Sequence, residues 1–344
     1  MIPIKNVYYM LSYAFTILNE QSYKDVSTES FENSLDLCAA ILIKGISIQI
    51  KRGLVKDYVS MNDELSMVRG KVDISSTIRK QSLINNRIYC DYDEFSSNTY
   101  LNQILKTTME LLLHADIKRE RKKQIKKLLV YFINVDSLDR YHINWHHQYN
   151  KNNQTYKMLI AICYMIVKGL IQTNDAGNVR LMNFFDEKNL PHLYEKFILE
   201  YYKKEFPMLD TSASQIKWDL DFASDNMLPI MQSDIMLKYH DLTLIIDAKC
   251  YGNSVQNYYD SPKLISANLY QIFTYVKNYD VAHNGKTSGM LLYAKTDEQV
   301  YPSSEYSMSG NKIEARTLDL NQDFSDIKNQ LNEIIYKYFE EISD

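Results

Sequence analysis

Two apolar stretches in the second half of the chain, Ile230–Tyr239 and Leu242–Cys250, are separated only by a short polar turn. Each stretch has the length of a β-strand and is rich in Ile, Leu and Met, so together they predict a β-hairpin. Residues 243–246 are mostly apolar, which is typical of a strand that passes through a core. The hairpin therefore predicts a β-sheet at the centre of the C-terminal half.

Helical and strand patterns alternate around this hairpin. Pro207 ends the first predicted helix, because proline cannot continue a helical hydrogen-bond ladder. The order of elements predicts a mixed sheet flanked by helices. The patterns place helices at Leu190–Phe206, Lys263–Tyr279 and Phe324–Ile342, and further strands at Gln215–Asp221, Ser288–Ala294 and Lys312–Leu318.

The N-terminal half has a different pattern, which begins with an amphipathic helix over residues 2–18. We expect an α+β / α/β chain of two domains, residues 1–180 and 181–344, of which the first mixes helices and strands. The patterns of this first domain place helices at Ser34–Lys44, Thr99–Asn134 and 155–171, and strands at Gly45–Ile50, Leu54–Ser60 and Glu64–Ile74.

Composition and charge narrow the classes of function. The 344 residues carry a formal net charge of −4, so no global positive field draws the chain onto nucleic acid, and a function on DNA would need help from another component. The four cysteines form no CxxC pair, which argues against a zinc site or a disulfide framework. The N-terminus lacks the features of a signal peptide, and the longest apolar run, Met158–Val167, is too short for a membrane span. We expect a cytoplasmic protein without membrane contact.

A strongly basic segment lies between residues 118 and 127, where seven of ten residues are Lys or Arg. Such a run is usually a solvated helix face. Contact with phosphate or with a partner is the alternative, and the sequence leaves both interpretations open.

Three polar residues of the predicted hairpin point to chemistry. Asp247 and Lys249 lie two apart on one strand, so their side chains project from the same face. The short turn allows Asp234, on the preceding strand, to meet Asp247. Two converging carboxylates suit a hard cation such as Mg²⁺, and a lysine beside them can orient a water. An apolar run followed by Asp-x-Lys is common, so a simple ion pair is the alternative.

Together these features are the pattern of the PD-(D/E)xK nuclease fold, and the sequence resembles the McrC family, the nuclease subunits of McrBC modified-cytosine restriction systems. The resemblance runs nearly from end to end. It is carried by Ile2–Ala14, Arg52-Gly53-Leu54, Asp57-Tyr58, Gly70–Asp73, Asn102–Lys106, Leu193–Phe197, Lys217-Trp218-Asp219, Ser233-Asp234-Ile235, Ile246–Lys249 and Asn268–Tyr275.

The resemblance implies roles for particular residues. Asp234, Asp247 and Lys249 would form the nuclease triad, with the carbonyl of Ala248 joining the two aspartates around Mg²⁺. Glu195 matches the family's first acidic position, where it would bind metal through water or a second ion. Gln271 and Tyr275 match a Gln-x-x-x-Tyr element, although Tyr275 also fits a helix packed on the sheet. Asp219 would support the edge of the sheet or bind DNA.

The resemblance also implies partners. A restriction-endonuclease-like domain would cut double-stranded, modified DNA while an McrB-like AAA+ GTPase hexamer, docked on the N-terminal domain, binds the GTP. Self-association of nuclease domains would allow double-strand cutting. Asn284-Gly285-Lys286-Thr287 resembles the end of a P-loop but lacks its first glycine, so we interpret it as a turn and expect no nucleotide site in this chain.

The sequence departs from the family pattern at three positions. Ser233 replaces the usual proline before the first aspartate. We expect an acid where Asn98 stands and an arginine where Gln103 stands, which raises the question of how the N-terminal region meets its partner. Two other functions remain as alternatives: a non-cleaving adaptor that activates the GTPase, and a glycosidase with paired carboxylates, which would leave Lys249 without a role.

Overall fold

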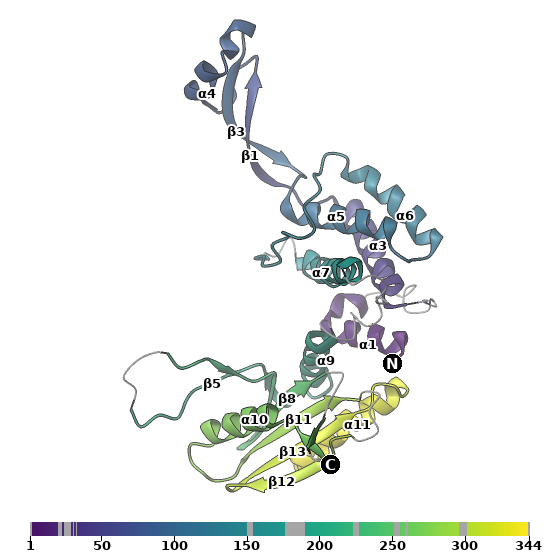
Figure 1. Cartoon of the computed structure of the whole chain (residues 1–344), viewed down its shortest axis with the longest axis vertical. Coiled ribbons are helices and arrows are strands. Elements are labelled where there is room, and N and C mark those ends of the chain that lie inside the picture. Colours follow the sequence, from purple (N-terminus) through teal and green to yellow (C-terminus); the bar gives the residue numbers. More distant parts are fainter. Residues whose placement is uncertain are drawn as a thin grey trace. The chain divides into compact units, whose positions relative to one another are not determined.

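The chain forms two compact units in the computed structural model (Figure 1). We call Met1–Glu29 with Val179–Asp344 the sheet unit, and Ser30–Asn178 the helical unit. The structure describes residues 2–19, 23, 29, 31, 33–149, 154–175, 190–222, 227–250, 255–258, 261–295 and 301–342. Within these ranges, no helix is both long and apolar enough to cross a bilayer.

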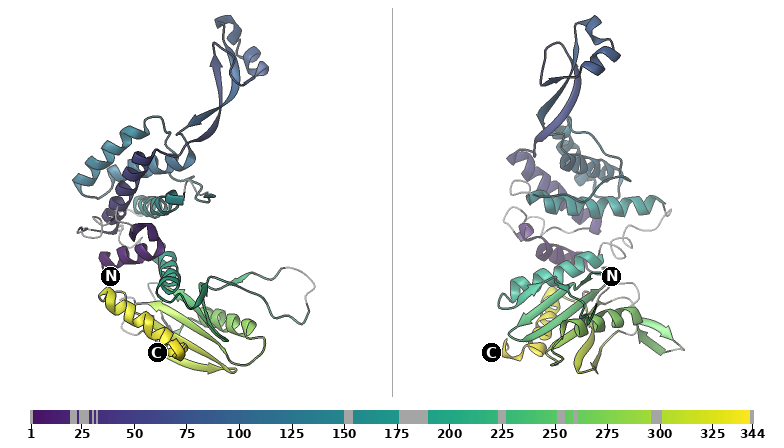
Figure 2. Two further views of the ribbon diagram at one scale, coloured as in Figure 1. Left: turned by 180° about the vertical axis from the view of Figure 1, so that it is seen from behind. Right: turned by 90° about the vertical axis from the view of Figure 1, so that its left-hand side faces the viewer.

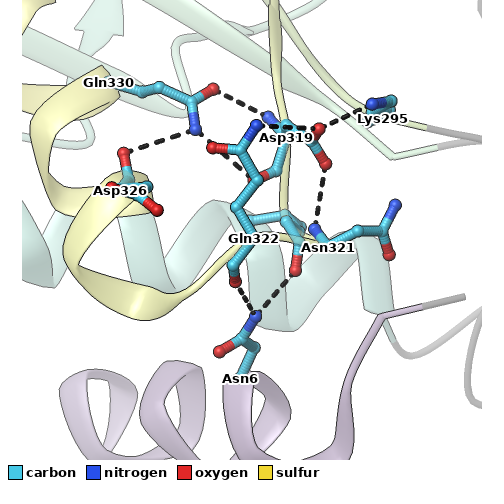
Figure 3. A network of polar contacts seen from close by, with 8 residues as sticks. Asn6, Lys295, Asp319, Asn321, Gln322, Asp326 and Gln330 are labelled. Atoms are coloured by element: carbon cyan, nitrogen blue, oxygen red, sulfur yellow. Dashed lines mark hydrogen bonds and ion pairs between the residues drawn. The ribbon is translucent and has the colours of Figure 1, made fainter.

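The division of the chain differs from the expected one at the N-terminus, because the first 29 residues group with the C-terminal half. The amphipathic helix α1 (Ile4–Ala14), followed by the short helix η1 (Thr16–Asn19), packs on α9 (Leu190–Glu205). Asn6 Nδ2 donates hydrogen bonds of 2.8 Å to the carbonyls of Leu320 and Gln322 (Figure 3). The expected boundary at residue 180 therefore omitted a long-range contact that α1 makes.

The sheet unit is built on a mixed six-stranded sheet, as expected, in the order β12-β13-β11-β8-β7-β4. β8 pairs parallel with β11, which pairs parallel with β13, and the other pairs are antiparallel. β4 and β12 were not predicted. The strands are β4 (Asp210–Ser212), β7 (Ile235–Tyr239), β8 (Leu242–Lys249), β11 (Thr287–Ala294), β12 (Ser304–Met308) and β13 (Asn311–Leu318).

Two of the expected strands are shorter than predicted: Gln215–Asp221, and Ile230–Tyr239, of which only Ile235–Tyr239 lies in the main sheet as β7. Only β5 (Gln215–Ile216) forms from the segment Gln215–Asp221, and it pairs with β6 (Met231–Gln232) outside the main sheet. Beyond β5 the Asp219 N–H donates to Asn278 Oδ1 rather than to a neighbouring strand. Trp218 Nε1 donates to the carbonyl of Pro229. A further pair, β9 (Val255–Tyr258) and β10 (Ser261–Leu264), precedes α10.

Helices cover the sheet. Helix α10 (Ser266–Tyr279) packs its buried residues Ile272, Tyr275 and Val276 on one face. The strand residues of that face include Ile245 and Leu291. The alternate residues of each strand point the other way. Helices α9 and α11 (Phe324–Tyr338) lie beside each other in the sheet unit (Figure 2). The hydroxyl of Tyr202 on α9 donates a hydrogen bond to the Leu331 carbonyl on α11. The short helix η6 (Glu340–Ile342) follows α11.

The helical unit contains the helices α3 (Ser34–Arg52), α5 (Tyr100–His114), α6 (Arg119–Leu129) and α7 (Gln154–Asp175). The strand expected at Gly45–Ile50 was wrong, because these residues continue α3. Leu42, Ile46 and Gln49 are buried at helical spacing, although the alternating isoleucines of this segment imitate a strand. The single helix expected over Thr99–Asn134 is divided into α5, α6 and the short η4 (Val130–Phe132).

A long hairpin forms the strand part of the helical unit. β1 (Asp57–Leu65) pairs antiparallel with β3 (Ile88–Ser96), which was not predicted and which also pairs with β2 (Lys71–Val72). The short helices α4 (Ile74–Arg79) and η3 (Ser82–Asn85) lie between β2 and β3. Gly70 precedes β2 with φ at 66°, where an added Cβ would collide with the Asp91 carbonyl.

Asn102 fixes the base of this hairpin to α5. The side chain is fully buried, and its Nδ2 donates to the carbonyls of Val55 and Ser97, at 2.8 Å each. Its Oδ1 accepts a 2.8 Å hydrogen bond from the hydroxyl of Tyr156 on α7. One side chain therefore joins the residues before β1 and after β3 to two helices.

We expect Asp36→Ala to lower the free energy of unfolding of the helical unit by about 3 kcal/mol. The Asp36 side chain is 0% exposed, and its Oδ1 lies 3.5 Å from Nε of Arg121, which is itself 10% exposed. Removal of the carboxylate would leave a buried guanidinium without its acidic partner. Denaturant unfolding followed by circular dichroism measures the change. The control Asp116→Ala, on an exposed residue of the same unit, should have little effect, and equal stability of both variants would contradict the account.

Candidate active site

The pairing of β7 with β8 brings the two predicted aspartates together. Ile235 pairs with Ile246, so Asp234, just before β7, lies beside the end of β8 that carries Asp247. The Ala248 N–H donates a 2.8 Å hydrogen bond to Asp234 Oδ2. Asp234 thus directly precedes the strand on which it was expected, but the structure does place it next to Asp247.

Lys249 links Asp247 to helix α10. Its Nζ lies 2.7 Å from Asp247 Oδ2 and donates a 3.2 Å hydrogen bond to Gln271 Oε1. Gln271 Nε2 in turn donates to the hydroxyl of Tyr275, at 2.9 Å. Tyr275 also belongs to the hydrophobic core, as expected for a helix packed on the sheet, and its role in the site stays a prediction. The chain of contacts fixes the position of the ammonium group.

Burial dominates the electrostatics of the site. Desolvation raises the pKa of Asp234, and the neighbouring charges of Asp247 and Glu195 raise it further, against the opposing effects of the Ala248 N–H and Lys249. Desolvation also raises the pKa of Asp247, while Lys249 works in the opposite direction. The negative charge of the two carboxylates is therefore only partly compensated by the protein, which favours a cation between them.

The donor set fits a hard divalent cation. Asp247 is 1% exposed, and its Oδ2 has no hydrogen bond of good geometry despite its ion pair with Lys249. Within the described part of the chain, no group of three or more His, Cys, Asp or Glu residues could hold a metal. The predicted donors are instead two carboxylates and the backbone carbonyl of Ala248. Oxygen donors of this kind match Mg²⁺, which keeps several waters, rather than Zn²⁺.

Glu195, on α9, lies close enough for its charge to raise the pKa of both aspartates, although it does not form a three-residue metal cluster with them. Nδ1 of His192 lies 3.5 Å from Glu195 Oε2. The hydrogen bond to Glu195 raises the pKa of this histidine, and the more distant Asp234 adds a smaller effect. Sequence reasoning missed His192, although its i, i+3 spacing from Glu195 on a helix could have indicated it.

Asp219 lies apart from this carboxylate cluster in the part of the chain that the structure describes. It is exposed in the segment after β5, where its backbone N–H is bonded to Asn278 of α10. The structure therefore places Asp219 beside α10 and gives its carboxylate no part in the contacts around Asp234 and Asp247.

The two unexpected amides in the helical unit contact each other. Gln103 Nε2 donates a 2.8 Å hydrogen bond to Asn98 Oδ1, which also accepts one from the Asp136 N–H. Asn98 Nδ2 donates to Asp136 Oδ2 at 2.6 Å. An acid and an arginine were expected at these two positions. The two neutral amides there form a hydrogen bond with each other instead. These two departures from the family pattern therefore occur together at one place in the helical unit.

The segment that resembles a P-loop is a turn. Gly285 has a φ of 73°, and its N–H donates to Asp280 Oδ2. Asn284 accepts a bond from the Lys286 N–H within the same turn, which leads into β11 and not into a helix.

Fold and site together define a mixed α+β protein with an acidic, lysine-containing site at the end of its central hairpin. The chain belongs to the McrBC 5-methylcytosine restriction system components, because the model of that family matches residues 4–294. It is 30% identical over 346 residues to the Type IV methyl-directed restriction enzyme EcoKMcrBC of Escherichia coli strain K12, covering 98% of both chains.

A solved structure shares the fold. The chain matches a half-complex from the tetradecameric assembly of Thermococcus gammatolerans McrB AAA+ hexamers with bound McrC, with a TM-score of 0.50 and 16% identity. The match covers 96% of this chain and 75% of that one. The likeness extends over both units and supports the mixed α+β architecture.

Proposed function

We propose that this chain is the Mg²⁺-dependent DNA endonuclease subunit of its restriction system, with a site of the PD-(D/E)xK type. The observation that carries the proposal is the cluster of Asp234, Asp247 and Lys249. The half-buried carboxylate of Asp234 and the buried carboxylate of Asp247 meet there beside a lysine whose position is fixed by Gln271. A role as an ion pair alone would need no second carboxylate.

Each residue of the cluster has a distinct task. Asp234, Asp247 and the Ala248 carbonyl would hold Mg²⁺, which supplies charge stabilisation at a phosphate oxygen when bound. Lys249 orients a water for in-line attack on the scissile phosphate and offsets the negative charge that develops there. The cut leaves a 5′-phosphate and a 3′-hydroxyl. Glu195 would bind the same cation through water, or would bind a second ion.

Gln271 is a positioning residue in this proposal. We expect Gln271→Ala to lower the cleavage rate about tenfold, less than loss of the lysine itself, because Lys249 would keep its charge and lose a fixed orientation. The rate at saturating Mg²⁺ measures this effect. Thr274→Ala is the matched control, since the Thr274 hydroxyl donates to the Tyr270 carbonyl of its own helix and not to Lys249. An unchanged rate in Gln271→Ala would contradict the assigned role.

The helical unit is the docking domain in the proposal, and its partner is an McrB-like AAA+ GTPase hexamer that binds the GTP and translocates modified DNA. The segment between β1 and β3 supports this role. It exposes an unusual number of large apolar side chains, which are typical of a protein contact surface. They are Met67, Val68, Ile74, Ile78, Leu83 and Ile84, all at least 60% exposed.

Cleavage of plasmid DNA tests the proposal. The chain is combined with the GTPase, GTP and Mg²⁺ on plasmids with and without methylated cytosine, and GTP turnover is recorded in the same reaction. Cutting that requires all components and leaves 5′-phosphate ends is the expected result. If GTP turnover is stimulated on a DNA known to be a substrate of the system and no cut appears, the chain is an adaptor and the proposal fails.

A further inference from the structure

One face of helix α6 is uniformly basic. Arg119 and Lys122 begin a series with the spacing i, i+3, i+4, i+7, i+8, which places all its members on one side of a helix. Four members are exposed and Lys122 is half-buried. We call these residues the basic stripe, which consists of Arg119, Lys122, Lys123, Lys126 and Lys127.

The opposite face of α6 holds the helix in place. Ile125 and Arg121 are buried, and Arg121 and Lys118 pair with the carboxylate of Asp36 on α3. Asp36 Oδ1 also accepts a hydrogen bond from the Lys118 N–H at the start of the helix. Lys118 and Arg121 therefore hold α6 against α3. The residues of the basic stripe take no part in these contacts.

The basic stripe is unfavourable for the helix that carries it. Like charges at i and i+4 repel, as Arg119 does with Lys123, and Lys122 with Lys126. Arg119 also stands in the first turn, where the helix dipole favours anions, and no side chain caps this end. Glu120 is the one acid in the helix, and it lies 4.0 Å from Lys123 with both side chains largely exposed. Uncompensated charge of this kind is suited to an anionic ligand.

The geometry points to the sugar-phosphate backbone of DNA as that ligand. We propose that the basic stripe is a sequence-independent DNA contact of this subunit. The five positions span about 12 Å along the helix axis, which reaches several phosphates of a duplex. A protein partner fits less well, because lysine is depleted in protein interfaces. The stripe also explains how a chain of net charge −4 could hold DNA locally.

The inference rests on the proposed function only in that DNA is the ligand, so its test omits cleavage. Binding of the full-length chain to an unmodified duplex of about 30 base pairs is measured by fluorescence anisotropy in EDTA, from about 50 to 200 mM salt. We compare Lys122→Gln/Lys126→Gln with Lys51→Gln/Lys157→Gln, which removes the same charge from exposed positions on α3 and α7. GTPase stimulation is recorded for both variants.

The stripe variant is expected to bind about tenfold more weakly at low salt and to lower the slope of log K against log salt by about 2, while the control variant keeps the wild-type slope. Equal slopes in all three proteins, or no binding by the wild type, would overturn the inference. Unchanged DNA binding with reduced GTPase stimulation would also overturn it, since the stripe would then contact the partner protein. The binding assay contains EDTA and measures no cleavage. A loss of DNA binding in it is therefore independent of whether the nuclease proposal fails.

Discussion

Replacement of Lys249 by alanine is expected to lower DNA cleavage by at least about a thousandfold while GTP hydrolysis by the partner is stimulated as before. The ammonium group lies 2.7 Å from Asp247 and is held by Gln271, so it is placed to orient the attacking water and to stabilise charge in the transition state. Removal of one such preorganised group costs about a hundredfold to a thousandfold in rate. Loss of the water's orientation adds to that.

Lys238→Ala provides the matched control for this variant. Lys238 lies on β7, four residues from Asp234, where it contacts the ring of Tyr279 rather than the carboxylates. The control should cut DNA at nearly the wild-type rate. A Lys249→Ala chain that cuts as fast as the Lys238→Ala chain would show that the lysine has no chemical role, and thermal melting of both variants excludes unfolding as the cause of any loss.

Removal of the first 29 residues is expected to prevent folding of the sheet unit. Val7, Met10 and Leu11 of α1 are at most 4% exposed, and burial of each such side chain contributes about 2 kcal/mol. Their combined loss, about 6 kcal/mol, is as large as the whole stability of many domains. Glu205 also loses the 2.7 Å hydrogen bond that the Tyr13 hydroxyl donates to it. A fragment of residues 179–344 should therefore lack a cooperative thermal transition.

The same fragment with residues 1–19 attached through a flexible linker should recover that transition. In the full-length chain, Leu11→Asp should reproduce the defect, whereas Lys5→Asp, on the exposed side of α1, should not. If the fragment 179–344 melts at the temperature of the full-length chain, then α1 is not part of the sheet unit. Calorimetry of these four proteins and of the full-length wild type distinguishes these outcomes.

The central strands could be predicted from the sequence because their signals are local. β8 and β11 are continuous apolar runs bounded by turns, and the structure confirms both within one residue. Gly45–Ile50 misled the prediction, because its alternating isoleucines fit a strand while the buried positions follow the helical period of α3. The grouping of α1 with the sheet unit depends on contacts such as Asn6 with Leu320, which no local pattern contains.

The candidate site followed the same rule. Asp247 and Lys249 share a strand, and a short turn determines the position of Asp234, so the sequence could predict that the three would meet. The approach of His192 to Glu195 depends on how the two side chains are oriented on α9. The hydrogen bond between Asn98 and Gln103 depends on the backbone conformation of the residues just before α5. A single sequence does not specify either contact.

The most direct test of the account is a comparison of wild type with Asp247→Ala, each assembled with the GTPase on methylated plasmid in Mg²⁺ and GTP. Asp247 is the residue that connects the candidate metal site with Lys249. The account predicts equal GTP turnover in both reactions and DNA cuts only with the wild type. Cuts made at the wild-type rate by Asp247→Ala would contradict the assignment of this site as the nuclease centre.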